Sequence, residues 1–215
     1  MTPKHFENRA ILLDLKGVKP APTPMSKSTG RNARDTLDPL GREAKAAFCR
    51  GTGICMYLGP DRFDVQFTVK ALASDMSSPV VLSMSRLRRC ARYLFGTADV
   101  GIEFAYQDRW DAVVVWTDGD WSGDVLTCKS TSAGAIQIGS HTVETWSVSQ
   151  QVVSLSSAES EFYAIGSGAA RGITVNNVML EMALATEPAA VPIQLVLRTD
   201  SDAARGMLHR VGSAG

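Results

Sequence analysis

The sequence lacks an excess of charge, a cysteine motif and a long apolar run. Lys plus Arg number 22 and so do Asp plus Glu, so the net charge is zero and any nucleic-acid binding has to come from local basic patches. The four cysteines form no CxxC pair and have no histidines at zinc spacing, which is typical of reduced thiols inside cells. No apolar stretch approaches the ~20 residues of a membrane span, and no signal-like segment opens the chain. We therefore expect a soluble, intracellular protein with no membrane partner, in the cytoplasm or the nucleus.

The first part of the chain is predicted to be helical. A short helical pattern over residues 1–16 precedes a stretch rich in Gly, Pro, Ser, Thr and Lys up to residue 41, which indicates a linker. Helices are then expected over residues 43–58, 63–76 and 79–95. In the last of these, Pro79 suits the first turn and Gly96 suits a C-cap. We expect three parts: a short helix and linker over 1–41, a helical segment over 42–98, and an α/β domain over 99–215.

The third predicted helix carries arginines away from its apolar stripe. Arg86 and Arg89 are among them, together with Arg88 and Arg92. Either these side chains form an ordinary solvated face, or they contact phosphate groups of a nucleic acid, for which the guanidinium is well suited.

From about residue 100 the pattern changes to strands. A short strand is expected at 101–104 and a stronger one at 111–117, followed by a hairpin of strands 133–138 and 142–148. A helix over 157–182 should begin with the capping box Ser156-x-x-Glu159. The buried stripe of this helix is predicted to consist of Phe162, Ile165, Ala169 and Ile173. A strand over residues 193–197 and a last helix over residues 202–209 complete the pattern. The order β-β-β-α-β-α predicts a mixed α/β sheet with three antiparallel strands and a crossover helix to a parallel strand.

Three acidic clusters stand at places where such a fold can bring them together. Asp118 ends the second predicted strand, Glu161 lies in the first turn of the long helix, and Asp200 follows the last strand. Carboxylates delivered to one point suit a pair of Mg²⁺ or Mn²⁺ ions, which support phosphodiester hydrolysis. Each cluster alone has an ordinary alternative: a turn, a favourable charge at a helix start, or an N-cap. A calcium loop over residues 118–124 lacks the required glycine and glutamate.

The residues around these clusters resemble a known family. The segment Trp116–Asp124, then 128–134 (CKSTSAG) and 146–164 (WSVSQQVVSLSSAESEFYA), resembles the ribonuclease H domain of copia-type retrotransposon polyproteins. Upstream, residues 19–25 (KPAPTPM), 57–65 (YLGPDRFDV) and 89–97 (RCARYLFGT) resemble the segment that trails the reverse transcriptase in these elements. The likeness covers almost the whole chain.

The resemblance implies a ribonuclease H-like fold that cleaves the RNA strand of an RNA–DNA hybrid during reverse transcription, with Mg²⁺ or Mn²⁺. It implies Asp118, Glu161 (rather than Glu159) and Asp200 as metal ligands and catalytic residues, and the reverse transcriptase portion of the polyprotein as a partner. Recognition of the hybrid would rest on its A-form shape and its 2′-hydroxyl groups. Lys129, Ser130 and Thr131 match a Lys-Ser-Thr motif that either contacts nucleic acid or holds the connection between the first two strands.

The sequence also departs from the family pattern. A fourth carboxylate is implied downstream of the third, but no acidic residue follows Asp202. We therefore expect a C-terminally truncated polyprotein fragment with an incomplete site. Two hypotheses follow: a ribonuclease H module, or a catalytically inactive retroelement fragment that keeps the fold and a nucleic-acid-binding or purely structural role.

Overall fold

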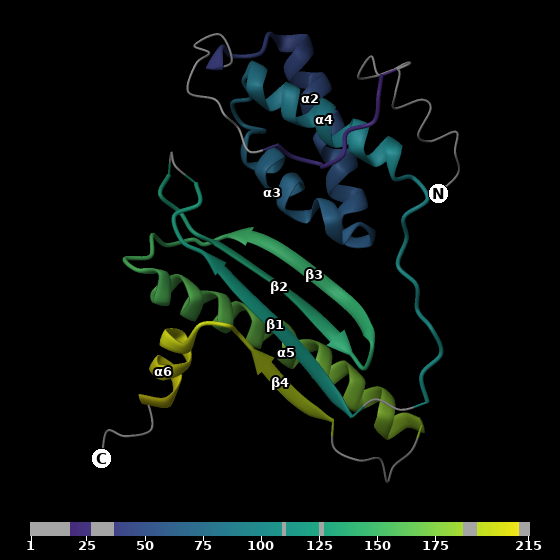
Figure 1. Cartoon of the computed structure of the whole chain (residues 1–215), viewed down its shortest axis with the longest axis vertical. Helices are drawn as coiled ribbons and strands as arrows, with labels where there is room; N and C mark the ends of the chain where they lie inside the picture. The colour runs from purple at the N-terminus through teal and green to yellow at the C-terminus, as the bar shows by residue number, and fades with distance from the viewer. Residues whose placement is uncertain (1–17, 27–36, 109–110, 125–126, 187–192, 211–215) are drawn as a thin grey trace. The chain divides into compact units, whose positions relative to one another are not determined.

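The computed structural model describes residues 18–26, 37–108, 111–124, 127–186 and 193–210 (Figure 1). The predicted helix over residues 1–16 lies outside this part. The chain divides into two compact units, Met1–Ile102 and Glu103–Gly215, and each has its own hydrophobic core. No helix in the described ranges is both long enough and apolar enough to cross a membrane.

The first unit is helical, as predicted. It contains α2 (Arg42–Leu58), α3 (Gln66–Ser74) and α4 (Val81–Gly96), with 3-10 turns at Gly59–Asp61 and Phe63–Val65 between α2 and α3. Their apolar faces meet in one core, whose largest fully buried side chains are Phe48, Leu72, Leu87 and Val65.

Both predicted ends of α4 need correction. The helix begins at Val81, because Val80 is the extended N-cap and Pro79 uses its carbonyl to accept a hydrogen bond from Leu40 N at 3.0 Å. At the other end Gly96 is the last helical residue rather than the cap. A Cβ on Gly96 would lie 2.6 Å from Cβ of Pro20, so this glycine permits a close approach between two segments.

The described part of the predicted linker lies along α4. Within residues 18–26, the carbonyl of Lys19 accepts a hydrogen bond from Arg92 Nε at 2.8 Å. The hydroxyl of Thr23 accepts one from Arg89 at 2.8 Å. These contacts fix part of this polar stretch to the helix, which its composition did not predict.

The second unit is a mixed α/β sheet, and the predicted order β-β-β-α-β-α is confirmed. Strands β1 (Ala112–Asp120), β2 (Thr131–Ile138) and β3 (His141–Ser149) precede α5 (Ser157–Thr186), β4 (Gln194–Arg198) and α6 (Asp202–Arg210). The sheet order is β3-β2-β1-β4, with β1 antiparallel to β2 and parallel to β4. This topology is compatible with a ribonuclease H-like fold.

The short strand predicted at residues 101–104 is wrong, because this stretch has no strand structure. Instead, the nearby side chain of Gln107 joins the turn between β2 and β3. Its Nε2 donates to the carbonyl of Ile138 at 3.1 Å, and its Oε1 accepts from the amide of Ser140 at 3.1 Å.

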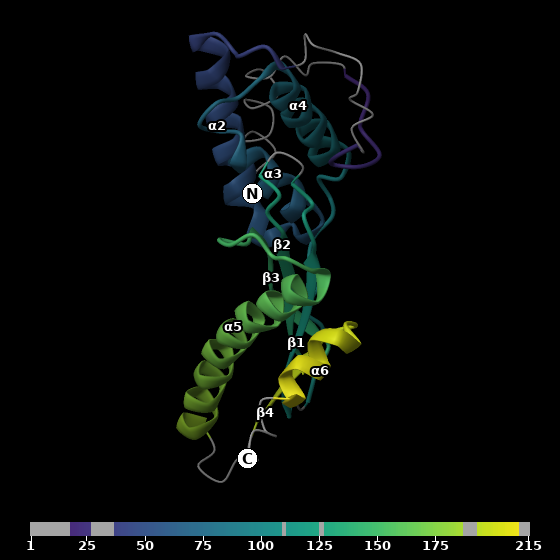
Figure 2. The ribbon, with the colours of Figure 1, turned by 90° about the vertical axis from the view of Figure 1, so that its left-hand side faces the viewer.

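Helix α5 packs on β1, β2 and β4 (Figure 2). The predicted stripe of large residues is wrong in part: Ile165 is buried, but Phe162 and Ile173 are exposed. The buried face instead follows small residues spaced four apart, namely Ser160, Ala164, Gly168 and Gly172.

The two glycines of this face explain why it is the buried one. A Cβ on Gly172 would lie 2.6 Å from Cγ2 of Val115 in β1, and one on Gly168 would collide with Thr117. These glycines lower the helix propensity, but they let the helix backbone approach the sheet more closely than larger side chains would allow.

Candidate metal centre

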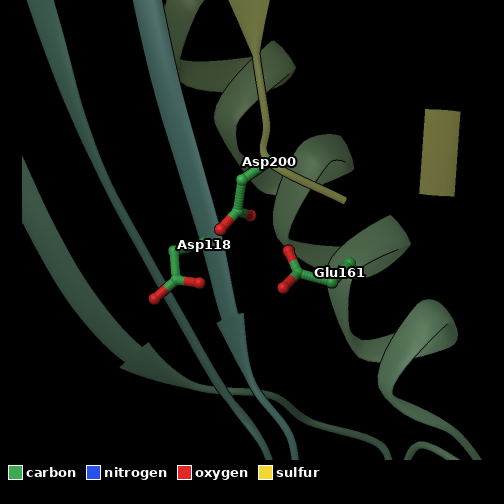
Figure 3. A group of neighbouring side chains, drawn as sticks. All are labelled: Asp118, Glu161 and Asp200. Atoms are coloured by element: carbon green, nitrogen blue, oxygen red, sulfur yellow. The ribbon is translucent and has the colours of Figure 1, made fainter. Parts of the chain in front are cut away.

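The structure brings the three predicted carboxylates together. Trp116 of β1 pairs with Arg198 of β4 in parallel, and Asp118 and Asp200 each lie two residues further along. Glu161 comes from the first turns of α5. One carboxylate oxygen from each of the three residues lies within 4.8 Å of the other two (Figure 3).

The strand that carries Asp118 is longer than predicted. The sequence suggested that it ends at Thr117, with a turn as the alternative for the residues that follow. Instead β1 continues to Asp120, which pairs with Thr131 of β2. Asp118 therefore stands on a regular strand whose backbone is held by its neighbours, and a ligand on such an element is well fixed.

Gly119 sets the distance between β1 and α5 at the site. A Cβ on this residue would lie 2.9 Å from the backbone nitrogen of Glu161 and 3.0 Å from its Cα. The amide of Gly119 also donates a hydrogen bond to the Glu161 carboxylate. This glycine was missed as a functional residue, and its place between two aspartates, Asp118 and Asp120, was the available signal.

Glu161 stands in an electrostatic environment that disfavours its charged form. Burial raises its pKa above the ordinary range, and the negative charges of Asp118 and Asp200 raise it further, while the hydrogen bond from Gly119 opposes the shift. Its Oε2 is buried and has no hydrogen-bond partner among the described residues. A divalent cation would supply the missing partner and cancel the repulsion, so the donor set fits Mg²⁺ or Mn²⁺.

The neighbouring acidic residues have other roles. Glu159 belongs to the predicted capping box: its backbone amide donates to Ser156 Oγ at 3.2 Å, and its carboxylate accepts from the amide of Leu155 at 2.7 Å. Asp202 pairs with Arg205 at 3.0 Å, one turn further along α6. The geometry thus gives a physical reason for the choice of Glu161 and Asp200 over these two neighbours.

The Lys-Ser-Thr motif lies at the start of β2. Ser130 is fully buried, and its Oγ accepts a hydrogen bond from the amide of Ser122, a residue with a positive φ of 52°. Thr131 is also buried and pairs with Asp120. Ser130 thus helps to hold the connection between β1 and β2, and contacts of Ser130 and Thr131 with nucleic acid stay predictions. A contact of Lys129, which is half-buried, with nucleic acid stays a prediction.

The two arginines predicted to contact phosphate lie in the first unit. Arg86 forms an ion pair with Asp75 at 3.7 Å, and Arg89 donates to Thr23 as described above. Both cations are thus engaged within that unit, and their contact with nucleic acid stays a prediction.

Comparison with known proteins identifies the family. The chain is 26% identical over 192 residues to the retrovirus-related Pol polyprotein from transposon RE1 of Arabidopsis thaliana, covering 84% of this chain and 12% of that protein. It is 30% identical over 168 residues to the corresponding polyprotein from transposon RE2, covering 75% of this chain and 11% of that protein. The chain belongs to the copia-type retrotransposon Pol polyproteins. The family inferred from the sequence motifs is therefore confirmed.

A copia-type polyprotein is far longer than this chain, which spans about one eighth of the RE1 protein. The chain is also 33% identical over 119 residues to the secreted RxLR effector protein 161 of Plasmopara viticola, covering 55% of this chain and 83% of that protein. No protein-family model and no solved structure matches the chain.

Proposed function

We propose that the second unit is a metal-dependent nuclease module that hydrolyses the RNA strand of RNA–DNA hybrids during reverse transcription. The observation that carries this proposal is the convergence of Asp118, Glu161 and Asp200, with one oxygen of Glu161 buried and unpartnered. The motifs that resemble the ribonuclease H domain of copia-type polyproteins support it, and membership of that family is consistent with it. The reverse transcriptase portion of the polyprotein would then be its partner.

In this function Asp118, Glu161 and Asp200 would hold Mg²⁺ or Mn²⁺. Such ions would supply activation of a water nucleophile and stabilisation of the charge that develops on the leaving oxygen. The chain itself contributes orientation. Strand β1 fixes Asp118, the close approach at Gly119 fixes the backbone of Glu161, and the end of β4 places Asp200 beside them.

A hollow of about 500 Å³ beside the site supports binding of a nucleic-acid backbone. Its lining includes Thr199, the neighbour of Asp200, and two cations, Arg198 and Arg205. The guanidinium of Arg198 stacks 4.8 Å from the ring centroid of Trp116. The remaining lining is Ile165, Leu197, Leu208 and His209. Cations of this kind contact phosphate without reading sequence, which suits recognition of a hybrid by shape.

The test is hydrolysis of an end-labelled RNA–DNA hybrid by the full 215-residue chain with Mg²⁺. We expect cleavage of the RNA strand, and we expect Asp118→Asn to reduce it to background because the ligand charge is lost. The matched control is Asp108→Asn, which changes an exposed aspartate of the second unit outside the cluster and should cleave like the wild type. Cleavage that persists undiminished in Asp118→Asn would refute the proposal.

One observation favours the alternative of an inactive fragment. In the described ranges only three carboxylates converge, whereas the family resemblance implies four. A chain that binds the hybrid but leaves it intact, with identical binding by wild type and Asp118→Asn, would support a purely nucleic-acid-binding role.

A further inference from the structure

Gln150, the residue after β3, is a buried hub of hydrogen bonds. It is only 6% exposed, and its backbone amide donates to the carbonyl of Ser130 at 2.8 Å. Its side-chain Nε2 donates to Ser132 Oγ at 3.0 Å and to the carbonyl of Ser160 at 2.8 Å. Its Oε1 accepts from Ser154 Oγ at 2.7 Å. One side chain thus ties together β2, the loop before α5, and the first turn of α5.

The bond to α5 reaches the residue next to a metal ligand. Ser160 is fully buried, and Glu161 follows it directly. The backbone of the same turn lies against Gly119 of β1, at the distances given above. The backbone of this turn is therefore held by a hydrogen bond from Gln150 and by close packing against Gly119.

We propose that Gln150 is a positioning residue of the metal centre, because it fixes the first turn of α5 and thereby places the Glu161 carboxylate beside Asp118. This inference rests on the proposed function of the same site. Glu161 has to be held in place because its carboxylate faces those of Asp118 and Asp200, and one of its oxygens has no hydrogen-bond partner among the described residues. Their mutual repulsion would turn a loosely held carboxylate away from the site.

The amide is the side chain that this position requires. Nε2 supplies two hydrogens, which serve Ser132 and Ser160, and Oε1 supplies the acceptor for Ser154. A glutamate carboxylate would place an acceptor against the carbonyl of Ser160, and an apolar side chain would leave all three partners without their bond to residue 150.

The chain supplies its own matched control. Gln151 is the same residue type one position later, but it is exposed. We would compare Gln150→Met with Gln151→Met, since methionine has a similar length and makes no such hydrogen bonds. Two more variants separate other causes: Ser154→Ala removes only the bond to Oε1, and Ile138→Ala opens a cavity at the far end of β2, opposite Val113.

The readouts are the Mn²⁺ dissociation constant of the full chain by calorimetry and the amide hydrogen exchange of residues 157–164 without metal. Gln150→Met is expected to weaken Mn²⁺ binding by roughly 10–100-fold, the effect typical of residues that orient a ligand. It should also speed exchange in the first turn of α5. Gln151→Met should match the wild type in both measurements, and Ser154→Ala should lie close to it.

Three results would overturn the inference: wild-type affinity in Gln150→Met, an equal loss in Gln151→Met, or an equal loss in Ile138→Ala, which would mean that general destabilisation is responsible. If the wild type itself does not bind Mn²⁺, the proposed function fails instead. In that case hydrogen exchange of the metal-free protein tests the positioning role of Gln150 by itself, and unchanged exchange in Gln150→Met would refute that role.

Discussion

In the first unit a buried cation is surrounded by groups that satisfy it. The guanidinium of Arg62 forms two hydrogen bonds with the carboxylate of Asp64, at 3.0 and 2.7 Å, and donates to the carbonyl and hydroxyl of Thr97 at 3.0 and 2.7 Å. Tyr93 donates its hydroxyl to Asp64 at 2.6 Å. In the second unit three carboxylates converge. None of them takes part in the ion pairs found among the described residues.

The difference separates a structural polar cluster from a site that is built for a ligand. Arg62 holds the pKa of Asp64 below its usual range, whereas burial and like charge raise the pKa of Glu161. The Arg62 cluster compensates the desolvation of its own charges, so removing one partner would be costly. The three carboxylates repel one another, and a bound cation would relieve that repulsion.

The comparison also explains two of the family motifs in the first unit. Arg62 and Asp64 belong to the segment 57–65, and Tyr93 and Thr97 belong to the segment 89–97. Their hydrogen bonds join the two segments. In this chain the four residues therefore have a structural role within the helical unit.

The largest loss of stability is expected when the cluster around Arg62 and Asp64 is broken. Arg62→Met leaves Asp64 without its cation, and we expect the first unit to lose about 3 kcal/mol of unfolding free energy. Urea denaturation followed by far-ultraviolet circular dichroism measures this loss. All four tryptophans lie in the second unit, so their fluorescence reports that unit and should keep its transition midpoint.

The control for this variant is Arg50→Met, which changes an exposed arginine of α2 and should cost less than about 0.5 kcal/mol. A loss of similar size in both variants would contradict the structural role of Arg62. A shift of both unfolding transitions together would break the distinction between the two units.

A smaller loss of stability is expected from overpacking next to the cluster of Asp118, Glu161 and Asp200. Gly119→Ala places a methyl group against the backbone of Glu161, and such overpacking costs about 1–3 kcal/mol. We expect the second unit to lose stability by this amount, measured by urea denaturation with tryptophan fluorescence, and Mn²⁺ binding to weaken in a calorimetric titration.

The matched control is Gly166→Ala, because a Cβ on Gly166 meets nothing within 4 Å. This helical position should gain roughly 0.5–1 kcal/mol from the lower backbone entropy of the unfolded chain. Equal stability changes of the same sign in the two glycine variants would contradict the close approach at Gly119.

The smallest expected effect is the pH dependence of stability, which should have opposite signs for Asp64 and Glu161. The lowered pKa of Asp64 gives stability that is present above the pKa of the unfolded chain, about 4, and is lost as the pH falls through the folded value. The raised pKa of Glu161 has the opposite sign: stability is full below about pH 4 and is lost as the pH rises through the folded value.

Two isosteric variants test these signs in the absence of metal. At neutral pH we expect Asp64→Asn to destabilise the protein and Glu161→Gln to stabilise it. As the pH falls, the Glu161→Gln difference should disappear first, between the raised folded pKa of Glu161 and about pH 4. The Asp64→Asn difference should decrease only below about pH 4, as the pH approaches the lowered folded pKa of Asp64. Denaturation curves over this pH range, recorded with a chelator present, check the prediction. A Glu161→Gln variant that is less stable than the wild type at neutral pH would show that the carboxylates do not repel one another.

Much of the fold could be predicted because its signals are local. The helices at 43–58 and 157–182 and the helix after Asp202 were placed close to their observed bounds from periodicity and capping residues. The strand at 101–104 failed because a short apolar run pairs only when a neighbouring strand is available. The buried face of α5 was missed because periodicity of large apolar residues does not indicate a face of glycine, alanine and serine.

By itself, the sequence determined the order of the elements and the three acidic residues, since these depend on spacing along the chain, and its motifs indicated the family by resemblance. The tertiary structure decided which groups touch. Glu159 is engaged in the helix cap, whereas Glu161 faces Asp118. The backbone of Gly119 approaches that of α5, and Gln150 forms a hydrogen bond with the carbonyl of Ser160 in the same helix. These relations depend on strand register and on the approach of one backbone to another, and neither quantity is encoded in any local stretch of residues.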